Sequence, residues 1–247
     1  MATSKEVYKD YSRFYDDYTD DVTCDLKIYT QSISTDDSIL EIGCGTGRVT
    51  EKVLEQNPKR VIGVDNSVDM LKIAQQKLSK YIALEKLILI EHDFSRNKLN
   101  FKYNKIFITY FTINYVVDNL LDFVINASCN LEKNGEIVID CFIPDSIINP
   151  SINNVERHFE PFCSNGKLYY VTDKRILENN IETRIVVFDD KSSDRVYMET
   201  IRKYYSIQEM TYILKQAGFK NIEWNYGYEC SSKRVCGNYL IKAIKRR

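Results

Sequence analysis

The first part of the chain alternates short apolar runs with segments that carry apolar residues at helical spacing. The apolar runs have strand length, and they occupy residues 38–43, 60–65, 87–91, 106–109 and 136–142. The segments with helical spacing lie between them, at residues 46–56, 67–80 and 116–131. Strands separated by helices of this length are typical of βαβ units, which build a parallel sheet. Because most of the runs are apolar throughout, we expect helices to cover both faces of this sheet.

The pattern changes after about residue 145. Further strand-like runs then follow one another without an intervening helix, at residues 167–172, 181–188 and 195–205. Turn-forming residues separate these runs, which predicts antiparallel pairing outside the main sheet.

A helix and two more strands complete the predicted sheet. Ser206 and Glu209 have the spacing of a capping box, and Gly218 is a typical residue just after a helix end. The last two strands are expected at residues 220–227 and 237–244. The fold class is therefore α/β: a doubly wound, mostly parallel seven-stranded sheet with helices on both faces, plus an antiparallel β insertion before the last helix.

We divide the chain into three parts on this basis. An N-terminal helical lid is expected at residues 1–30, the main α/β domain at 31–145 and 205–247, and the insertion at 146–204. The lid contains tyrosines at positions i, i+3, i+7 and i+10, which a helix places on one face: Tyr8, Tyr11, Tyr15 and Tyr18. Such a face can pack against the core, cover a ligand, or do both.

Composition and charge argue against several classes of protein. A hydrophobic content of 44% is normal for a folded domain, and a net charge of −1 provides no basic surface for long nucleic acid. The N-terminus has no apolar signal region, and no apolar run approaches the length that spans a bilayer. We therefore expect a soluble, cytoplasmic protein that binds neither nucleic acid nor membrane.

The cysteines do not form a metal-binding pattern. There are 7 of them, none in a CxxC pair, and only 2 histidines could supplement them. We expect no metal site, and free thiols in a reducing compartment.

The chemistry-bearing motif lies where the first strand meets the first helix. Gly43, Gly45 and Gly47 follow the strand in GxGxG spacing, which lets the backbone turn sharply and touch a ligand. Asp65 ends the second strand, where a carboxylate can hold both ribose hydroxyls of a nucleoside. A dinucleotide oxidoreductase, the alternative, has GxGxxG spacing, but Arg48 occupies the position of its third glycine.

Together with Glu41, two residues before Gly43, this cluster resembles the first motif of class I S-adenosylmethionine-dependent methyltransferases. Residues 65–71 resemble the second motif of that family, and His92-Asp93-Phe94 resembles the third. The resemblance covers residues 36–145 closely and 205–245 loosely, and it implies an enzyme that uses S-adenosylmethionine.

The resemblance also implies which residues hold the cofactor. The glycine bend is expected to contact the amino-acid end, Asp65 the ribose, and Asp93 with Phe94 the adenine. The predicted cofactor-binding residues, two lid tyrosines included, are Tyr11, Tyr15, Gly43, Cys44, Gly45, Gly47, Arg48, Asp65, Asn66, Met70, Asp93, Phe94 and Thr109.

Methyl transfer requires alignment more than acid–base groups, because the sulfonium already activates the methyl carbon. If a general base exists, His158 in the insertion is the first candidate, with Tyr115 and Glu156 behind it. A surface or packing role for His158 is the competing interpretation.

The substrate class is less constrained than the cofactor. Residues 109–115 contain neither the Asn/Asp-Pro-Pro-aromatic loop of amino-methylating nucleic-acid enzymes nor a Pro-Cys pair. The layout is similar to that of small-molecule and peptide amine methyltransferases, so we expect N-methylation of a small molecule or peptide end by a monomer or homodimer. The alternatives are O-methylation of a hydroxyl or carboxyl group, RNA methylation, and cofactor binding without catalysis.

Overall fold

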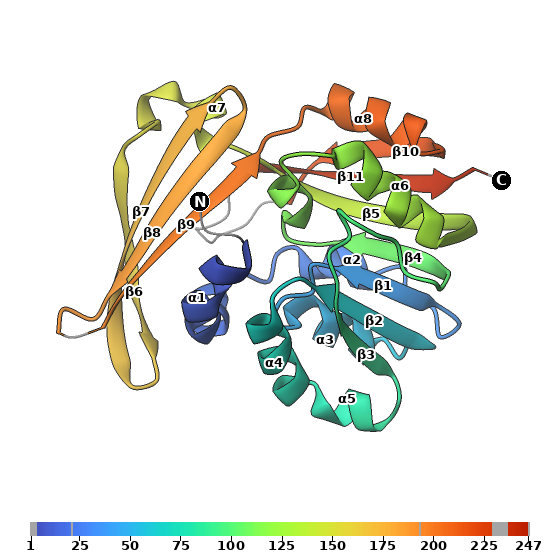
Figure 1. Ribbon diagram of the computed structural model, residues 1–247, viewed down its shortest axis with the longest axis horizontal. Helices are drawn as coiled ribbons and strands as arrows, with labels where there is room; N and C mark the ends of the chain where they lie inside the picture. The colour runs from blue at the N-terminus through green and yellow to red at the C-terminus, as the bar shows by residue number, and fades with distance from the viewer. Residues whose placement is uncertain (1–3, 21, 193, 229–236, 247) are drawn as a thin grey trace.

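The computed structural model describes the chain except residues 1–3, 21, 193, 229–236 and 247, and the side chains of residues 4–7 are not described either. Within this part the main sheet has seven strands in the order β10-β11-β5-β4-β1-β2-β3 (Figure 1). Only β11 runs antiparallel to its neighbours. The strands are β1 Ser38–Ile42, β2 Arg60–Asp65, β3 Leu87–Glu91, β4 Tyr103–Ile108, β5 Leu131–Ile143, β10 Phe219–Tyr226 and β11 Gly237–Lys245. The predicted fold class is confirmed.

Helices cover both faces of this sheet because successive strand residues point to opposite sides. Ile39 of β1 packs in a core with α2, α3 and the residues around α5, whereas Leu40 packs in a second core with α6 and α8. The helix α4 lies beside α1 and also contacts β2, β3 and α5. The helices are α1 Ser4–Thr19, α2 Leu26–Thr30, α3 Arg48–Glu55, α4 Val68–Lys77, α5 Ser79–Ala83, α6 Leu120–Asn130, α7 Asp145–Ile148 and α8 Ile207–Gln216, with 3-10 turns η1 Thr112–Tyr115 and η2 Pro150–Ile152.

The insertion forms a second, antiparallel sheet in the order β6-β7-β8-β9. Its strands are β6 Glu156–Ser164, β7 Lys167–Glu178, β8 Ile181–Asp189 and β9 Arg195–Lys203. One face packs on α1, where Phe14 stacks on Phe188 with ring centroids 5.4 Å apart. The helix α1 therefore lies between the two sheets (Figure 1).

Some boundaries differ from the sequence expectations. The strand β6 was not predicted, because its charged and apolar residues alternate and form no apolar run. The helix expected at residues 116–131 begins only at Leu120, since η1 and a left-handed Asn119 (φ 58°) precede it. The capping box of Ser206 and Glu209 is present as predicted.

The free-thiol expectation is wrong for one cysteine. Cys24 is disulfide-bonded, which residue spacing alone does not reveal. Cys44, Cys129, Cys141 and Cys163 have free thiols, whereas Cys230 and Cys236 lie outside the described residues. Across the described part of the chain, every helix is too short or too polar to cross a bilayer.

Candidate cofactor and substrate site

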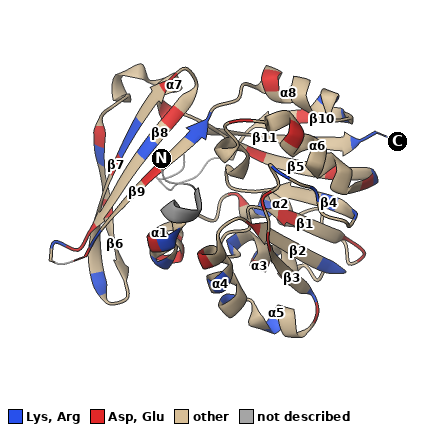
Figure 2. Cartoon of the chain, in the orientation of Figure 1, with Lys and Arg blue, Asp and Glu red and all other residues tan. Residues whose placement is uncertain are grey.

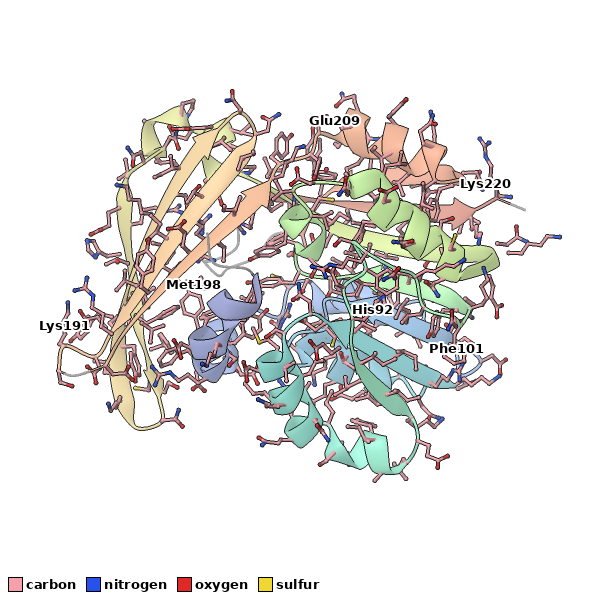
Figure 3. The ribbon with its side chains drawn as sticks, in the orientation of Figure 1. His92, Phe101, Lys191, Met198, Glu209 and Lys220 are labelled. Atoms are coloured by element: carbon pink, nitrogen blue, oxygen red, sulfur yellow. The ribbon has the colours of Figure 1, made fainter. Side chains whose placement is uncertain are left out.

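A cavity of about 440 Å³ opens at the carboxyl ends of the parallel strands, bounded by α1 and the insertion sheet. Its volume lies within the range of small-molecule and cofactor sites, roughly 300–1,000 Å³. The main domain contributes its walls through loops after β1, β2, β3 and β4, and the insertion contributes residues of β8 and β9. Figure 3 labels one lining residue from each side, His92 after β3 and Met198 on β9.

The glycine bend brings backbone to the cavity wall. Gly43 has a left-handed φ of 77°, and a Cβ added there would lie 2.2 Å from Oγ1 of Thr112. Gly45 also has a positive φ, but an added Cβ would meet nothing within 4 Å, because this residue lines the cavity. The bend therefore requires glycine at Gly43 for space, and it leaves the Gly45 backbone open to a ligand.

Asp65 is held in place by the same bend. Its Oδ2 accepts a hydrogen bond from N of Gly45 at 2.9 Å, and its Oδ1 accepts one from N of Ser67 at 2.8 Å. Burial raises the pKa of Asp65, while these backbone donors act in the opposite direction. The backbone of Asn66 is a further donor to this carboxylate, which lines the cavity and keeps capacity to accept a hydrogen bond from a ribose hydroxyl.

The predicted adenine side also lies on the cavity wall. Asp93 and Phe94 both line it, together with Asn66 and Met70. Oδ1 of Asp93 accepts hydrogen bonds from N and Oγ of Ser95, at 3.0 and 2.5 Å. The residues that line the cavity thus include an acid and an aromatic ring that are neighbours in the sequence.

Glu41 is buried beneath the bend. Its two carboxylate oxygens accept hydrogen bonds from Oγ1 of Thr50 at 2.6 Å and of Thr109 at 3.0 Å. Burial raises the pKa of Glu41 to about 7, although both threonine hydrogen bonds lower it. Glu41 thereby joins β1 to α3 and to the segment after β4.

Four of the predicted cofactor residues lie outside the cavity lining. Thr109 contacts Glu41, Cys44 is buried, and Gly47 is the N-cap of α3, with a φ of 82° and the side chain of Leu78 close by. The guanidinium of Arg48 donates to both oxygens of the Asp25 carboxylate, at 2.8 and 2.6 Å. These contacts position the loop and the segment after α1.

Six tyrosines line the cavity. The edge-on pairs Tyr11 with Tyr15 and Tyr8 with Tyr115 have ring centroids 5.6 and 6.3 Å apart. Burial and then Tyr115 raise the pKa of Tyr8 well above its ordinary value. The lining tyrosines are Tyr8, Tyr11, Tyr15, Tyr18, Tyr110 and Tyr115. Their π faces attract cations, including a sulfonium or an ammonium group.

Polar contacts tie α1 to the main domain beside this wall. The carboxylate of Asp16 accepts hydrogen bonds from Oγ1 of Thr46 at 2.5 Å and from Nζ of Lys77 at 2.7 Å. One partner belongs to the glycine loop and the other to α4, so these contacts hold α1 against this side of the cavity.

The two predicted base candidates occupy different places. Tyr115 lines the cavity, whereas His158 lies outside its lining, with an exposed side chain whose Nε2 is 3.8 Å from Glu156. Strand alternation explains this, because His158 belongs to the exposed set of β6 and Arg157 to the opposite set.

Sequence reasoning did not identify the lining residues that the insertion supplies. Arg184, Met198 and Arg202 reach the cavity from β8 and β9. They belong to no motif, and only the pairing of the insertion strands brings them together.

Comparison with known proteins agrees with this geometry. A family model described as "Methyltransferase domain" matches residues 39–135. A probable cobalt-precorrin-6B C(15)-methyltransferase (decarboxylating) of Saccharolobus solfataricus is 29% identical over 122 residues, which cover 47% of this chain and 58% of that protein. A malonyl-[acyl-carrier protein] O-methyltransferase of Bacillus cereus is 27% identical over 199 residues, covering 78% of this chain and 68% of that one.

Solved structures share the whole layout, insertion included. An S-adenosylmethionine-dependent methyltransferase from Clostridium acetobutylicum superimposes with a TM-score of 0.74 at 19% identity, covering 97% of this chain and 99% of that one. A sugar N-methyltransferase from Streptoalloteichus gives a TM-score of 0.73 at 17% identity, covering 100% and 96%. At these identities the likeness shows a common fold. Residues 39–135 therefore match a methyltransferase domain, and the chain shares the fold of S-adenosylmethionine-dependent methyltransferases, although it spans less than two thirds of the first curated relative that it matches.

Proposed function

We propose that this protein transfers a methyl group from S-adenosylmethionine to an amino group of a small molecule. The observation that carries the proposal is the composition of the cavity: a glycine bend with Asp65 on one side, and a wall of six tyrosines on the other. The sugar N-methyltransferase with the same fold supports an amine as the acceptor.

The residues of the chain would divide the work in the following way. Gly45 and Asp65 hold the cofactor, which supplies a methyl carbon activated by a sulfonium. The tyrosines exclude water and present electron-rich faces to the positive charge, which passes from the sulfonium to the amine. Alignment of the reacting atoms accounts for most of the rate enhancement that we expect, roughly 7–11 kcal/mol of the barrier.

The hydroxyls of Tyr8 and Tyr115 orient the acceptor in this proposal. A tyrosine hydroxyl is protonated at neutral pH, and burial, which raises the pKa of Tyr8, keeps it so; its oxygen can offer a lone pair to an amine N–H. An amine that enters neutral needs no base before the transfer, and its product proton can pass to water afterwards. His158 is not required for this chemistry.

O-methylation is the second candidate, because the relative from Bacillus cereus is an O-methyltransferase. Both candidates are tested together with radiolabelled S-adenosylmethionine and paired acceptors that differ only in the nucleophile, such as an amino sugar and the corresponding sugar. Short peptides with free and acetylated N-termini form a second pair, and transfer RNA a third arm.

We expect label on the amine member of a pair, and no label with Asp65→Ala. Label on the hydroxyl member, or on RNA, would contradict the proposal. Tyr115→Phe should raise KM or lower kcat for the amine without weakening S-adenosylhomocysteine binding.

A further inference from the structure

The inner face of the insertion sheet carries a cluster of charged side chains. Two of its arginines, Arg184 on β8 and Arg202 on β9, line the cavity opposite the glycine bend. Figure 2 shows basic segments on these two strands. The charged residues of the cluster are Arg157, Arg175, Arg184, Arg202, Asp145, Asp173 and Glu182.

Buried carboxylates hold the arginines of this cluster in place. Asp173 is fully buried and accepts hydrogen bonds from the guanidinium groups of Arg175 and Arg184, at 3.0 and 2.8 Å. Burial alone would raise the pKa of Asp173, but Arg184 and Arg175 outweigh it and hold the pKa well below its usual range. Glu182, also fully buried, pairs with Arg202. Among the described residues named above, four guanidinium groups face three carboxylates.

The orientation of Arg184 is defined atom by atom. Its Nε donates to Asp173, its Nη2 lies 2.7 Å from the same carboxylate, and Nη2 also donates to the hydroxyl of Tyr18 at 3.3 Å. These contacts use one edge of the guanidinium. Within the part of the chain that the structure describes, Nη1 makes no hydrogen bond and no ion pair. The side chain is only 11% exposed.

A ligand that shields this donor from water has to satisfy it. A guanidinium offers five N–H groups in a rigid fork, which suits carboxylate and phosphate oxygens. If a neutral apolar group filled the cavity, it would remove water from Nη1 and provide no hydrogen-bond acceptor in its place. The acids of the main-domain wall are Asp65 and Asp93, which we assign to the cofactor, and Asp118 after η1.

We propose that Arg184 binds an anionic group of the acceptor, so that the substrate is an amine that also carries a carboxylate or phosphate. This inference rests on the proposed function, because it places the anion at the insertion wall and the amine among the tyrosines. Asp173 and Tyr18 act as positioning residues, which hold the guanidinium so that Nη1 faces the cavity.

The test measures anion binding without turnover. The full chain is first saturated with S-adenosylhomocysteine and then titrated with inorganic phosphate, with acetate, or with neutral acetamide, while thermal stability and ligand NMR line widths are followed. We expect phosphate, acetate or both to bind, and acetamide not to bind. The responding anion tells phosphate from carboxylate. Equal responses to acetate and acetamide with none to phosphate, or no response to either anion, would overturn the inference.

Variants assign the binding to the proposed atom. Arg184→Met should weaken anion binding by about 10- to 100-fold, the loss of one charge-assisted hydrogen bond. Arg184→Lys keeps a positive charge beside Asp173 but loses the forked N–H groups of the guanidinium. Its affinity for the anion should therefore be at least about tenfold lower, and this variant serves as the test if the Arg184→Met protein does not fold. Arg195→Met, with a side chain 71% exposed on β9, is the matched control and should change nothing.

The same data separate this inference from the function itself. Unchanged anion binding in both Arg184 variants refutes the role of Arg184 while leaving the methyltransferase proposal intact. Failure of the parent protein to take up S-adenosylhomocysteine would refute the methyltransferase proposal instead.

Discussion

The ion pair between Arg48 and Asp25 gives the most demanding test of how the glycine loop is held. Asp25 is fully buried and the Arg48 side chain is 15% exposed, and two hydrogen bonds of 2.8 and 2.6 Å join them. Arg48 also donates to the carbonyl oxygen of Val22 at 2.9 Å, and its guanidinium lies 4.8 Å from the ring centroid of Tyr110. Asp25→Ala would leave this guanidinium in place without its carboxylate.

The expected cost follows from burial. Removing one partner of a buried pair costs about 3–5 kcal/mol, because the remaining charge stays desolvated. For a chain of this size each 1 kcal/mol lowers Tm by about 2–4 °C, so we expect a drop of roughly 6–20 °C. Lys52 and Glu55 form an exposed pair at 2.8 Å, and Glu55→Ala should cost about 0–1 kcal/mol.

Urea unfolding of the parent, Asp25→Ala and Glu55→Ala at one pH measures the loss of unfolding free energy in each variant. The double change Asp25→Leu with Arg48→Met removes the two charges together and should recover most of the stability that Asp25→Ala loses. It should also keep its affinity for S-adenosylhomocysteine, because Arg48 does not line the cavity. A loss for Asp25→Ala no larger than that for Glu55→Ala would refute the reasoning.

Three further changes test other contacts. Burial raises the pKa of Glu41 from 4.5 to about 7. The stability of the parent relative to Glu41→Gln should therefore be greatest below pH 4.5 and be lost as pH rises through about 7. Measuring the Tm of both proteins at a series of pH values tests this. Gly43→Ala should cost about 1–3 kcal/mol in urea unfolding through its clash with Thr112, and adding Thr112→Ala should return part of that loss. Ser206→Ala should cost about 0.5–2 kcal/mol, since Ser206 caps α8 by accepting from N of Glu209 at 3.2 Å. An equal cost for Gly43→Ala in the presence and absence of Thr112 would exclude the clash.

Much of the fold follows from local patterns. The strands β2 and β3 begin and end at the predicted residues, because each is an apolar run bounded by polar residues. The strand β6 escaped prediction since only one of its faces is apolar and charged residues interrupt it. The disulfide of Cys24 escaped because pairing depends on the folded arrangement and not on spacing.

The residues of the site also fall into those that a local sequence motif predicts and those that it does not. Gly43, Gly45 and Asp65 carry a local motif, and the structure places all three on the cavity wall. Arg184 lies on the far side of the cavity, and only the register of β8 against its neighbours decides that it faces inward. A motif can therefore locate one wall of the cavity, whereas the opposite wall depends on contacts between distant segments.

Isothermal calorimetry with S-adenosylhomocysteine tests the cofactor site most directly. The parent chain should bind one molecule, and Asp65→Asn should bind it about 10- to 100-fold more weakly, because it loses charge-assisted hydrogen bonds to the ribose. No heat of binding for the parent with either S-adenosylhomocysteine or S-adenosylmethionine, or equal affinities of parent and variant, would contradict the site described above.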